Sequence, residues 1–336
     1  MILVTGATGF VGSHLLLHLL EKEQKVRALY RNSAKIEFVK SIFKHYKKES
    51  LFEKIEWFEG DITDIPQMEN AFADVDFVYH CAALVSFDPN DEEILRKTNI
   101  EGTANVVNLS LVNAVKKLCF VSSIAALGDL QEHENTISET TEWNPEKNHS
   151  DYAISKYGAE MEVWRAQQEG LNVVIVNPGV IIGPCKPNES SGVIFSKVKK
   201  GMPYYTKGNT GFVAVEDVVK IMILLMESDT NGEKFILVGE NISFEKLLTK
   251  IAIGLQVKPP HKYAQKGLTE ILWRLDWLLS RLSGTKRKFS KATAKSLHSK
   301  TLYSNEKIKT TFGYAFIPIE EAIKTTAVYF SEGILD

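Results

Sequence analysis

Cysteine is scarce in this sequence, and its three copies do not form a motif. Cys81, Cys119 and Cys185 are odd in number, widely spaced and without a CxxC pair in a chain of 336 residues. Disulfide frameworks and structural zinc sites both need paired cysteines, so the sequence predicts neither. The three thiols fit a reducing cytosol, where a buried cysteine behaves as a small apolar residue.

An excess of charge of one sign and long apolar runs are also absent. Lysine and arginine number 40 against 42 aspartates and glutamates, a net charge of −2, so nothing in this balance indicates a nucleic-acid partner. The most apolar run, at 221–226, is far too short to span a bilayer, and an apolar strand that begins almost at Met1 leaves no room for a targeting peptide. We expect a cytoplasmic protein that acts on a small molecule, without a metal, membrane or nucleic-acid partner.

Short runs rich in branched apolar residues alternate with longer segments of helical periodicity. Such runs, apolar on both faces, are typical of parallel strands covered by helices; they lie at 2–5, 25–30, 54–60, 76–82, 117–123, 171–177 and 234–239. Helices are expected between them at 10–23, 34–47, 66–73, 90–115, 151–168 and 215–227. The alternation predicts an α/β fold with a doubly wound parallel sheet of the Rossmann type.

A smaller, mostly helical C-terminal lobe is expected beside this sheet, because the alternation of strands and helices stops after about residue 240 and helices dominate. Residues 184–212 are rich in turn formers and indicate an excursion away from the sheet. We therefore expect a nucleotide-binding domain at 1–178, to which 213–240 return. Residues 179–212 and 241–336 would form the substrate-binding lobe, with the cleft between the two.

The first strand runs into a glycine-rich turn, VTGATGFVGSH, at residues 4–14. Gly6, Gly9 and Gly12 allow a tight turn, a close approach of the backbone to a pyrophosphate, and close packing of the next helix. The amino terminus of that helix offers unpaired N–H groups and a positive dipole end to the phosphates. The turn therefore predicts a dinucleotide site that also includes Thr8, Phe10 and Val11.

The ends of the next three strands bear on which nucleotide binds. An acidic residue usually meets the ribose 2′-hydroxyl of NAD about 20 residues after the glycine turn, but this chain has Tyr30 and Arg31 there. An arginine can pair with the 2′-phosphate of NADP and stack on adenine, so NADP is preferred and NAD remains possible. Asp61, followed by Ile62, can accept from the adenine amino group, and the small residues Cys81, Ala82 and Ala83 leave space for the cofactor.

These motifs, in this order, resemble the extended short-chain dehydrogenase/reductases of the NAD-dependent epimerase/dehydratase superfamily. The resemblance covers nearly the whole chain and rests on TGxxGxxG at 5–12, GDITD at 60–64, HCAA at 80–83, TNIEGTANV at 98–106, FVSSIAALG at 120–128, YxxxK at 152–156, NPGVIIGP at 177–184 and FVAVEDVV at 212–219. It also implies a homodimer formed through the helices at 90–115 and 151–168.

The resemblance assigns roles to the residues that match these motifs. Tyr152 would exchange the proton with the substrate oxygen, and Lys156 would bind the nicotinamide ribose and lower the pKa of the tyrosine. Ser123 would hydrogen-bond the reacting oxygen, although the neighbouring Ser122 could be confused with it, and Asn99 would organise the hydrogen bonds of the site. The remaining expected cofactor contacts are Val121, Pro178 and Gly179.

Two branches of the superfamily remain open. The patterns SSIAALG and NPxxxxGP are more similar to the branch of dihydroflavonol reductases and 3β-hydroxysteroid dehydrogenases, which act on carbonyls or alcohols of fairly apolar molecules. Nucleotide-sugar epimerases and dehydratases usually carry basic residues where this chain has Phe212, Ala214 and Glu216, and a diphosphate needs cationic or N–H partners. We expect the reductase or dehydrogenase, with the sugar enzyme as the alternative. A cofactor sensor without catalysis is disfavoured because Tyr152 and Lys156 are both present.

One amphipathic segment has no role in these motifs. Residues 268–282 place one apolar stripe along a helix, formed by Leu268, Ile271, Leu272, Leu275, Leu278, Leu279 and Leu282. Such a stripe is usually part of a core or of a contact between helices. The alternatives are a lid over the cleft or a helix at a membrane surface, where the basic residues that follow could meet anionic lipid.

Overall fold

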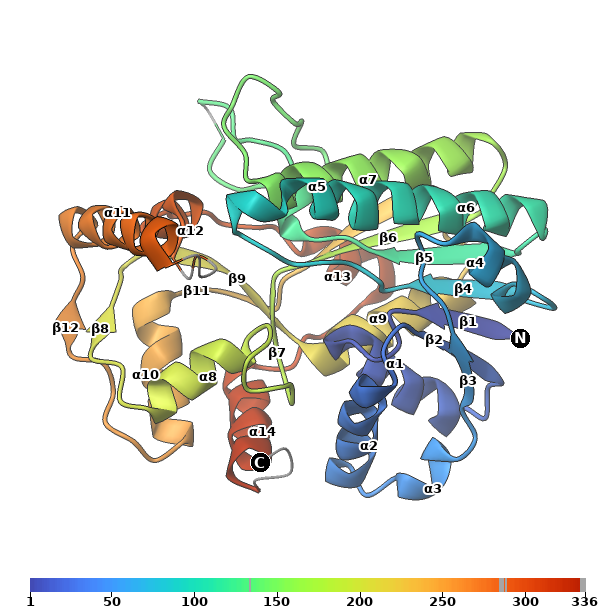
Figure 1. The fold of residues 1–336 in the computed structure, drawn as a ribbon, viewed down its shortest axis with the longest axis horizontal. Helices are drawn as coiled ribbons and strands as arrows, with labels where there is room; N and C mark the ends of the chain where they lie inside the picture. The colour runs from blue at the N-terminus through green and yellow to red at the C-terminus, as the bar shows by residue number, and fades with distance from the viewer. Residues whose placement is uncertain (133, 284–286, 288, 333–336) are drawn as a thin grey trace.

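Seven parallel strands form the central sheet of the protein, in the order β10-β6-β5-β4-β1-β2-β3 (Figure 1). The computed structural model describes residues 1–132, 134–283, 287 and 289–332. Each of the seven expected runs overlaps one of these strands, which are β1 (Ile2–Thr5), β2 (Val26–Tyr30), β3 (Glu56–Glu59), β4 (Phe77–His80), β5 (Lys117–Val121), β6 (Val173–Pro178) and β10 (Glu233–Leu237). The predicted parallel sheet is confirmed.

Helices cover both faces of this sheet, as a doubly wound fold requires (Figure 1). One face is covered by α4 (Ile65–Ala71), α6 (Gly102–Val112) and α7 (Asp151–Gln168), and the other by α1 (Phe10–Glu21), α2 (Ile36–His45), α3 (Glu49–Phe52) and α9 (Val215–Glu227). Successive strand residues divide between the two layers, since Leu3 packs in one apolar cluster and Ile2 and Val4 in the other. The strands are therefore apolar throughout because both of their faces are buried.

A smaller group of elements lies at the carboxyl side of β6 and continues to the C-terminal part of the chain. Its three-stranded sheet, β11-β9-β7, packs with three helices in one apolar cluster; these elements are β7 (Val180–Ile182), α8 (Gly192–Lys199), β9 (Asn209–Ala214), β11 (Glu240–Ser243), α10 (Phe244–Gly254) and α14 (Ile319–Ser331). Beyond them lie β8 (Tyr204–Tyr205) paired with β12 (Lys262–Tyr263), and α11 (Lys266–Ser283), α12 (Lys291–Ser296) and α13 (Glu306–Phe312). The sequence did not reveal these strands, because β7, β8 and β12 have only two or three residues and β9 and β11 are partly polar.

The helix expected over 90–115 is not continuous. It consists of α5 (Glu92–Leu95), a π-helical segment (Arg96–Glu101) and α6, which starts at Gly102. A Cβ atom at Gly102 would lie 2.6 Å from the Cδ1 atom of Ile62, so α6 approaches the loop after β3 closely. The π-helical segment buries Asn99, and single π turns of this kind are frequent at functional sites.

The apolar stripe of residues 268–282 lies on the outside of the molecule. The only buried side chain of α11 is that of Thr269, so the expectation that the stripe belongs to a core is wrong. Among the residues that the structure describes, no helix has the length and apolar content needed to cross a bilayer.

Candidate active site

The glycine-rich turn joins β1 to α1 at the carboxyl edge of the sheet. Gly6 has φ +65°, and a Cβ atom there would lie 2.5 Å from the backbone nitrogen of Ala82. A Cβ atom at Gly12 would overlap the carbonyl oxygen of Gly6, so both positions require glycine. Helix α1 begins at Phe10, directly after the turn. The turn therefore has the compact backbone and the free helix amino terminus that suit a pyrophosphate.

A chain of buried hydrogen bonds ties this turn to the neighbouring strand. The Oγ1 atom of Thr5 lies 2.6 Å from Nδ1 of His80, and Nε2 of His80 lies 2.9 Å from Oγ1 of Thr103. The Oγ1 atom of Thr5 also accepts from the backbone N–H of Ala82 at 3.3 Å. Burial lowers the pKa of His80 to about 3, so this histidine is neutral and acts as a structural link.

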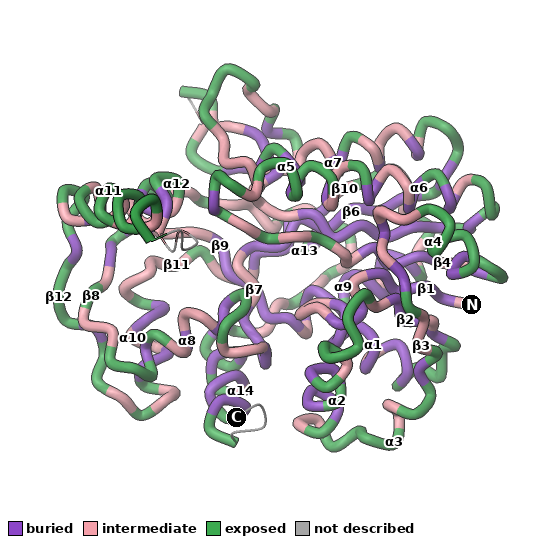
Figure 2. Tube along the Cα trace, viewed as in Figure 1, coloured by how far each residue is buried: buried purple, intermediate pink, exposed green. Residues whose placement is uncertain are grey.

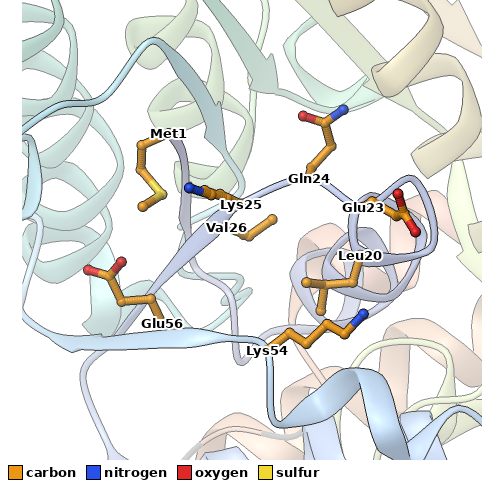
Figure 3. Close-up of a pocket in the computed structure, with 8 residues that line it drawn as sticks. All are labelled: Met1, Leu20, Glu23, Gln24, Lys25, Val26, Lys54 and Glu56. Carbon is orange, nitrogen blue, oxygen red and sulfur yellow. The ribbon is translucent and has the colours of Figure 1, made fainter.

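The other residues predicted to bind the cofactor follow the carboxyl ends of the neighbouring strands. Tyr30 ends β2 and is followed by Arg31, and Val121 ends β5. The rest are Asp61 and Ile62 after β3, Cys81, Ala82 and Ala83 after β4, and Pro178 and Gly179 at the end of β6. In an open α/β sheet, ligands bind at this edge. The structure thus brings the predicted residues to one side of the sheet. The hollow drawn in Figure 3, about 290 Å³ in volume, opens at the opposite edge between Met1, Lys25 and Glu56.

Arg31 and Asp61 form an ion pair at the ends of β2 and β3. The Nη1 atom of Arg31 lies 3.2 Å from Oδ2 of Asp61, and the arginine side chain is 63% exposed. Burial raises the pKa of Asp61, but hydrogen bonds from Thr63 and Arg31 outweigh burial and hold that pKa below its usual value. The carboxylate is therefore ionised at neutral pH, and it holds the guanidinium at the edge of the sheet.

Three side chains meet where β5 ends and α7 begins. Tyr152 lies in the first turn of α7, which is capped by the Ser150 hydroxyl, and the Ser123 side chain is near enough to the Tyr152 hydroxyl to act on its pKa. One turn later, Lys156 is buried; its Nζ atom donates to the carbonyl oxygen of Val121 at 2.8 Å and lies 4.5 Å from the Phe120 ring centroid. The structure thus brings together the serine, tyrosine and lysine that the motifs predict.

The pKa values of this cluster differ from the sequence-based expectation. Burial raises the pKa of Tyr152, and the hydrogen bond from Ser123 only partly opposes the rise. Burial also lowers the pKa of Lys156 to about 8, while the negative charge of Glu160 opposes that change. The expected lowering of the tyrosine pKa by Lys156 is not found here, because the ammonium group points to the Val121 carbonyl.

Asn99 connects the loop after β4 to α7. Its Nδ2 atom donates to the Leu84 carbonyl and to the Ser155 hydroxyl, both at 2.9 Å, and its Oδ1 atom accepts from the Leu84 N–H at 2.7 Å. Ser155 lies between Tyr152 and Lys156 in the sequence, so these bonds fix the helix that carries both. Asn99 acts by positioning, because its side chain bonds to Leu84 and Ser155 and so holds α7 in place.

Glu160 also belongs to the site, and the sequence reasoning missed it. Its Oε1 atom accepts from the Ser122 hydroxyl at 2.6 Å and from Nδ2 of Asn177 at 2.5 Å, and Asn177 also donates to the Ser123 carbonyl. Ser122 is therefore turned away from Tyr152, whereas Ser123 faces it. One feature of the sequence could have indicated this role. Glu160 follows Lys156 by four residues, so the two side chains share one face of the helix.

The surface beside Tyr152 is apolar. The ring of Phe87 lies 5.6 Å from the Tyr152 ring, and 51% of the Phe87 side chain is exposed. Val85, in the same loop, is exposed as well. Nothing in the described part of the chain groups three or more histidine, cysteine or acidic side chains as a metal site would. The cluster therefore offers a positioned proton donor beside an apolar surface.

Comparisons with known proteins agree with this geometry. Residues 2–239 match the family model described as the NAD dependent epimerase/dehydratase family. A protein of Synechocystis sp., named provisionally as a dihydroflavonol 4-reductase, is 31% identical over 255 residues, which cover 74% of this chain and 71% of that protein.

Solved structures agree over nearly the full length of the chain. The crystal structure of gox2253 has a TM-score of 0.81 and 29% identity, and the match covers 100% of this chain and 99% of that one. A UDP-glucose 4-epimerase from Thermotoga maritima, solved with UDP-glucose, has a TM-score of 0.75 and 25% identity, with 98% of each chain covered. Both a reductase and an epimerase are thus among the relatives.

Proposed function

Since the chain belongs to the NAD dependent epimerase/dehydratase family, we propose that it is an NAD(P)-dependent oxidoreductase that interconverts a carbonyl group and an alcohol on a small, largely apolar molecule. The observation that carries this proposal is the meeting of Ser123, Tyr152 and Lys156 where β5 ends and α7 begins, with the exposed Phe87 ring 5.6 Å from the Tyr152 ring. A proton donor pair at an apolar surface suits a ketone or aldehyde better than a sugar diphosphate.

Each residue of the cluster has a part in this chemistry. When bound, the nicotinamide nucleotide supplies or accepts the hydride. Tyr152 gives its proton to the substrate oxygen in the reducing direction, and Ser123 donates a hydrogen bond that holds this oxygen. Both interactions strengthen as negative charge develops on the oxygen, so they lower the barrier more than they strengthen binding. In the complex, Lys156 would stabilise the tyrosinate and bind the nucleotide ribose.

The region that binds the diphosphate in sugar enzymes has a structural role in this chain. Phe212 and Ala214 are buried, and the Glu216 carboxylate accepts from the Tyr46 hydroxyl at 2.7 Å. Asp217 accepts from the Tyr314 hydroxyl and from the Ile317 N–H. None of these groups is a cation that could meet a diphosphate. The alternative, a nucleotide-sugar epimerase or dehydratase with tightly bound NAD, rests on the relatives of that type.

A substrate panel separates these two functions. The purified protein is incubated with NADPH or NADH and with aldehydes, ketones, UDP-sugars or GDP-sugars, while the nicotinamide absorbance and the products are followed. A carbonyl-dependent loss of absorbance supports the oxidoreductase. Conversion of a sugar nucleotide without net cofactor change contradicts it.

We infer that NADP is preferred, and that Arg31 provides this preference. Replacing Arg31 with serine is expected to weaken NADPH binding about tenfold, because the 2′-phosphate loses a charge-assisted partner. NADH binding should change little. Titration of nucleotide fluorescence measures both constants, and Lys35→Ser, an exposed change in the next turn, is the control. An equal loss for both nucleotides would contradict the assignment.

We also infer a homodimer formed through α6 and α7, whose outer surfaces carry exposed apolar side chains. Val112, Ile154 and Met161 are 81%, 50% and 40% exposed. Placing a carboxylate in such a contact buries a charge, so Met161→Glu is expected to produce monomers. Sedimentation velocity measures the mass, and Val328→Glu on α14 is the matched control. If Met161→Glu keeps the mass of the wild type, the contact lies elsewhere.

In this proposal, residues 179–212 and 241–336 bind the substrate and residues 1–178, with 213–240, bind the nucleotide. The polypeptide leaves the large sheet at β6, directly beside Pro178 and Gly179, and enters the smaller sheet at β7. The reacting groups would then lie between the two parts.

A further inference from the structure

Helix α11 is exposed along most of its length (Figure 2). Six side chains make up the α11 apolar face, with exposed fractions from 45% to 77%: Ile271, Leu272, Leu275, Leu278, Leu279 and Leu282. A helix that covers a core buries such a stripe, whereas α11 leaves it exposed to solvent. A continuous apolar surface of this kind marks an interaction site.

The polar face of α11 is held against the protein by specific contacts. The buried Thr269 has its Oγ1 atom 2.9 Å from Nε2 of His298, and the Asp276 carboxylate accepts from the N–H of Phe289 at 3.2 Å. These bonds set the rotation of the helix about its axis. The outward direction of the apolar face is therefore fixed by the contacts on the opposite face.

The sequence around the end of α11 is strongly basic. Between Trp277 and Asn305 it contains no aspartate or glutamate and seven basic residues: Arg281, Lys286, Arg287, Lys288, Lys291, Lys295 and Lys300. Because the net charge of the whole chain is −2, the remainder carries −9. A strongly cationic stretch of the sequence thus adjoins the exposed apolar helix.

We propose that α11 binds the surface of a membrane that contains anionic lipids. The α11 apolar face enters the boundary between headgroups and acyl chains, and the exposed Lys291, Lys295 and Lys300 meet the lipid phosphates. A second copy of the chain is a poorer partner, because a two-fold contact would bring the same basic stretch against itself. The net charge of −2 for the whole chain conceals this basic stretch, and a helix at a membrane surface needs no spanning segment.

Vesicle flotation with the full chain tests the proposal. Vesicles of phosphatidylglycerol and phosphatidylcholine in equal parts should carry the protein upward, and vesicles of phosphatidylcholine alone should not. Added salt should weaken the binding, because it screens the attraction between exposed charges. Equal binding to both kinds of vesicle, or binding to neither, would overturn the proposal.

Two double variants locate the contact. Leu275→Gln with Leu279→Gln keeps good helix formers and should lower vesicle affinity at least about tenfold. Ile253→Gln, on an exposed site of α10, should not. Lys291→Gln with Lys295→Gln should lower affinity on the order of tenfold, whereas Lys40→Gln with Lys44→Gln on α2 should leave it unchanged. Circular dichroism confirms that each variant is folded.

Two results would point away from a lipid surface. If the leucine variant still binds anionic vesicles as the wild type does, α11 is not the contact. If that variant instead splits an oligomer in sedimentation velocity, the face binds a second copy. Neither measurement needs a substrate or nucleotide, so the outcome is independent of the proposed enzymatic activity.

Discussion

Replacing Tyr152 with phenylalanine is expected to lower kcat about a thousandfold and to leave the fold and nucleotide affinity nearly unchanged. The change removes one hydroxyl, the group on which the Ser123 side chain acts. Proton transfer from a positioned side chain contributes roughly a hundredfold to ten-thousandfold to a rate. The remaining Ser123 hydroxyl cannot replace Tyr152, because a serine hydroxyl is a much weaker acid. Turnover is measured with the best carbonyl substrate from the panel, and nucleotide affinity by fluorescence titration.

Tyr157→Phe is the control for this experiment. Tyr157 lies on the same helix, and its ring stacks on Trp143 at 4.4 Å between centroids. Losing its hydroxyl should leave kcat within about twofold of the wild type, since most surface substitutions are nearly neutral. The comparison also separates an enzyme from a cofactor sensor, because a sensor would keep its function without the Tyr152 hydroxyl. Full turnover by Tyr152→Phe would remove Tyr152 from the mechanism.

Replacing Lys156 with methionine is expected to stabilise the protein and to lower turnover at least about a hundredfold. Burial lowers the pKa of Lys156 from 10.5 to about 8, which corresponds to a cost of roughly 3 kcal/mol for keeping the charged group folded at neutral pH. Methionine has a similar shape and no charge. It loses the hydrogen bond to the Val121 carbonyl, which offsets about 1 kcal/mol. A net gain of about 2 kcal/mol in the free energy of unfolding remains.

The pH dependence of this gain has a definite sign. Below pH 8 the lysine is protonated in both the folded and unfolded states, so its cost is fully present and methionine gives its largest gain. Between about pH 8 and the unfolded pKa of 10.5, the folded protein releases the proton first, and the cost disappears. Urea unfolding at pH 7 and pH 10 should show a gain that shrinks at the higher pH. Lys44→Met, on the exposed side of α2, should show neither the gain nor its pH dependence.

If Lys156→Met loses turnover and gains stability, the protein keeps Lys156 for its activity at the expense of the stability of the fold. A buried ammonium group is retained where a methionine would fold better, which is common at sites selected for chemistry. If Lys156→Met proves less stable than the wild type at both pH values, the lysine is a structural residue whose bond to Val121 matters more than its burial.

The sequence predicted the sheet well because its signal was local. Each parallel strand is buried on both faces, so apolar runs such as 171–177 mark strands directly, and Gly6 and Gly12 mark the turn that only glycine can form. The meeting of Ser123, Tyr152 and Lys156 followed from motif spacing. Spacing alone, however, could not give the direction of the Lys156 ammonium group or the burial that raises the pKa of Tyr152.

The features that the sequence did not reveal depend on contacts between distant residues. Glu160 joins the site through Ser122 and Asn177, which are 38 and 17 residues away. The outward direction of the α11 apolar face depends on Thr269 and its partner His298. Periodicity identifies an amphipathic helix, but it cannot say whether the protein itself or another surface covers the apolar side.

The π-helical segment at Arg96–Glu101 has a consequence for the geometry of its helix. A π turn holds one residue more than an α turn, so it rotates the residues before it by about 100° relative to those after it. Through this offset, Asn99 faces Leu84 and Ser155 while α6 still presents Val106 and Val107 to the sheet. Deleting a single residue here would restore a regular helix, and only one of these two faces could then keep its alignment. An insertion or deletion in this segment should therefore disturb the structure more than the substitution of one of its exposed residues.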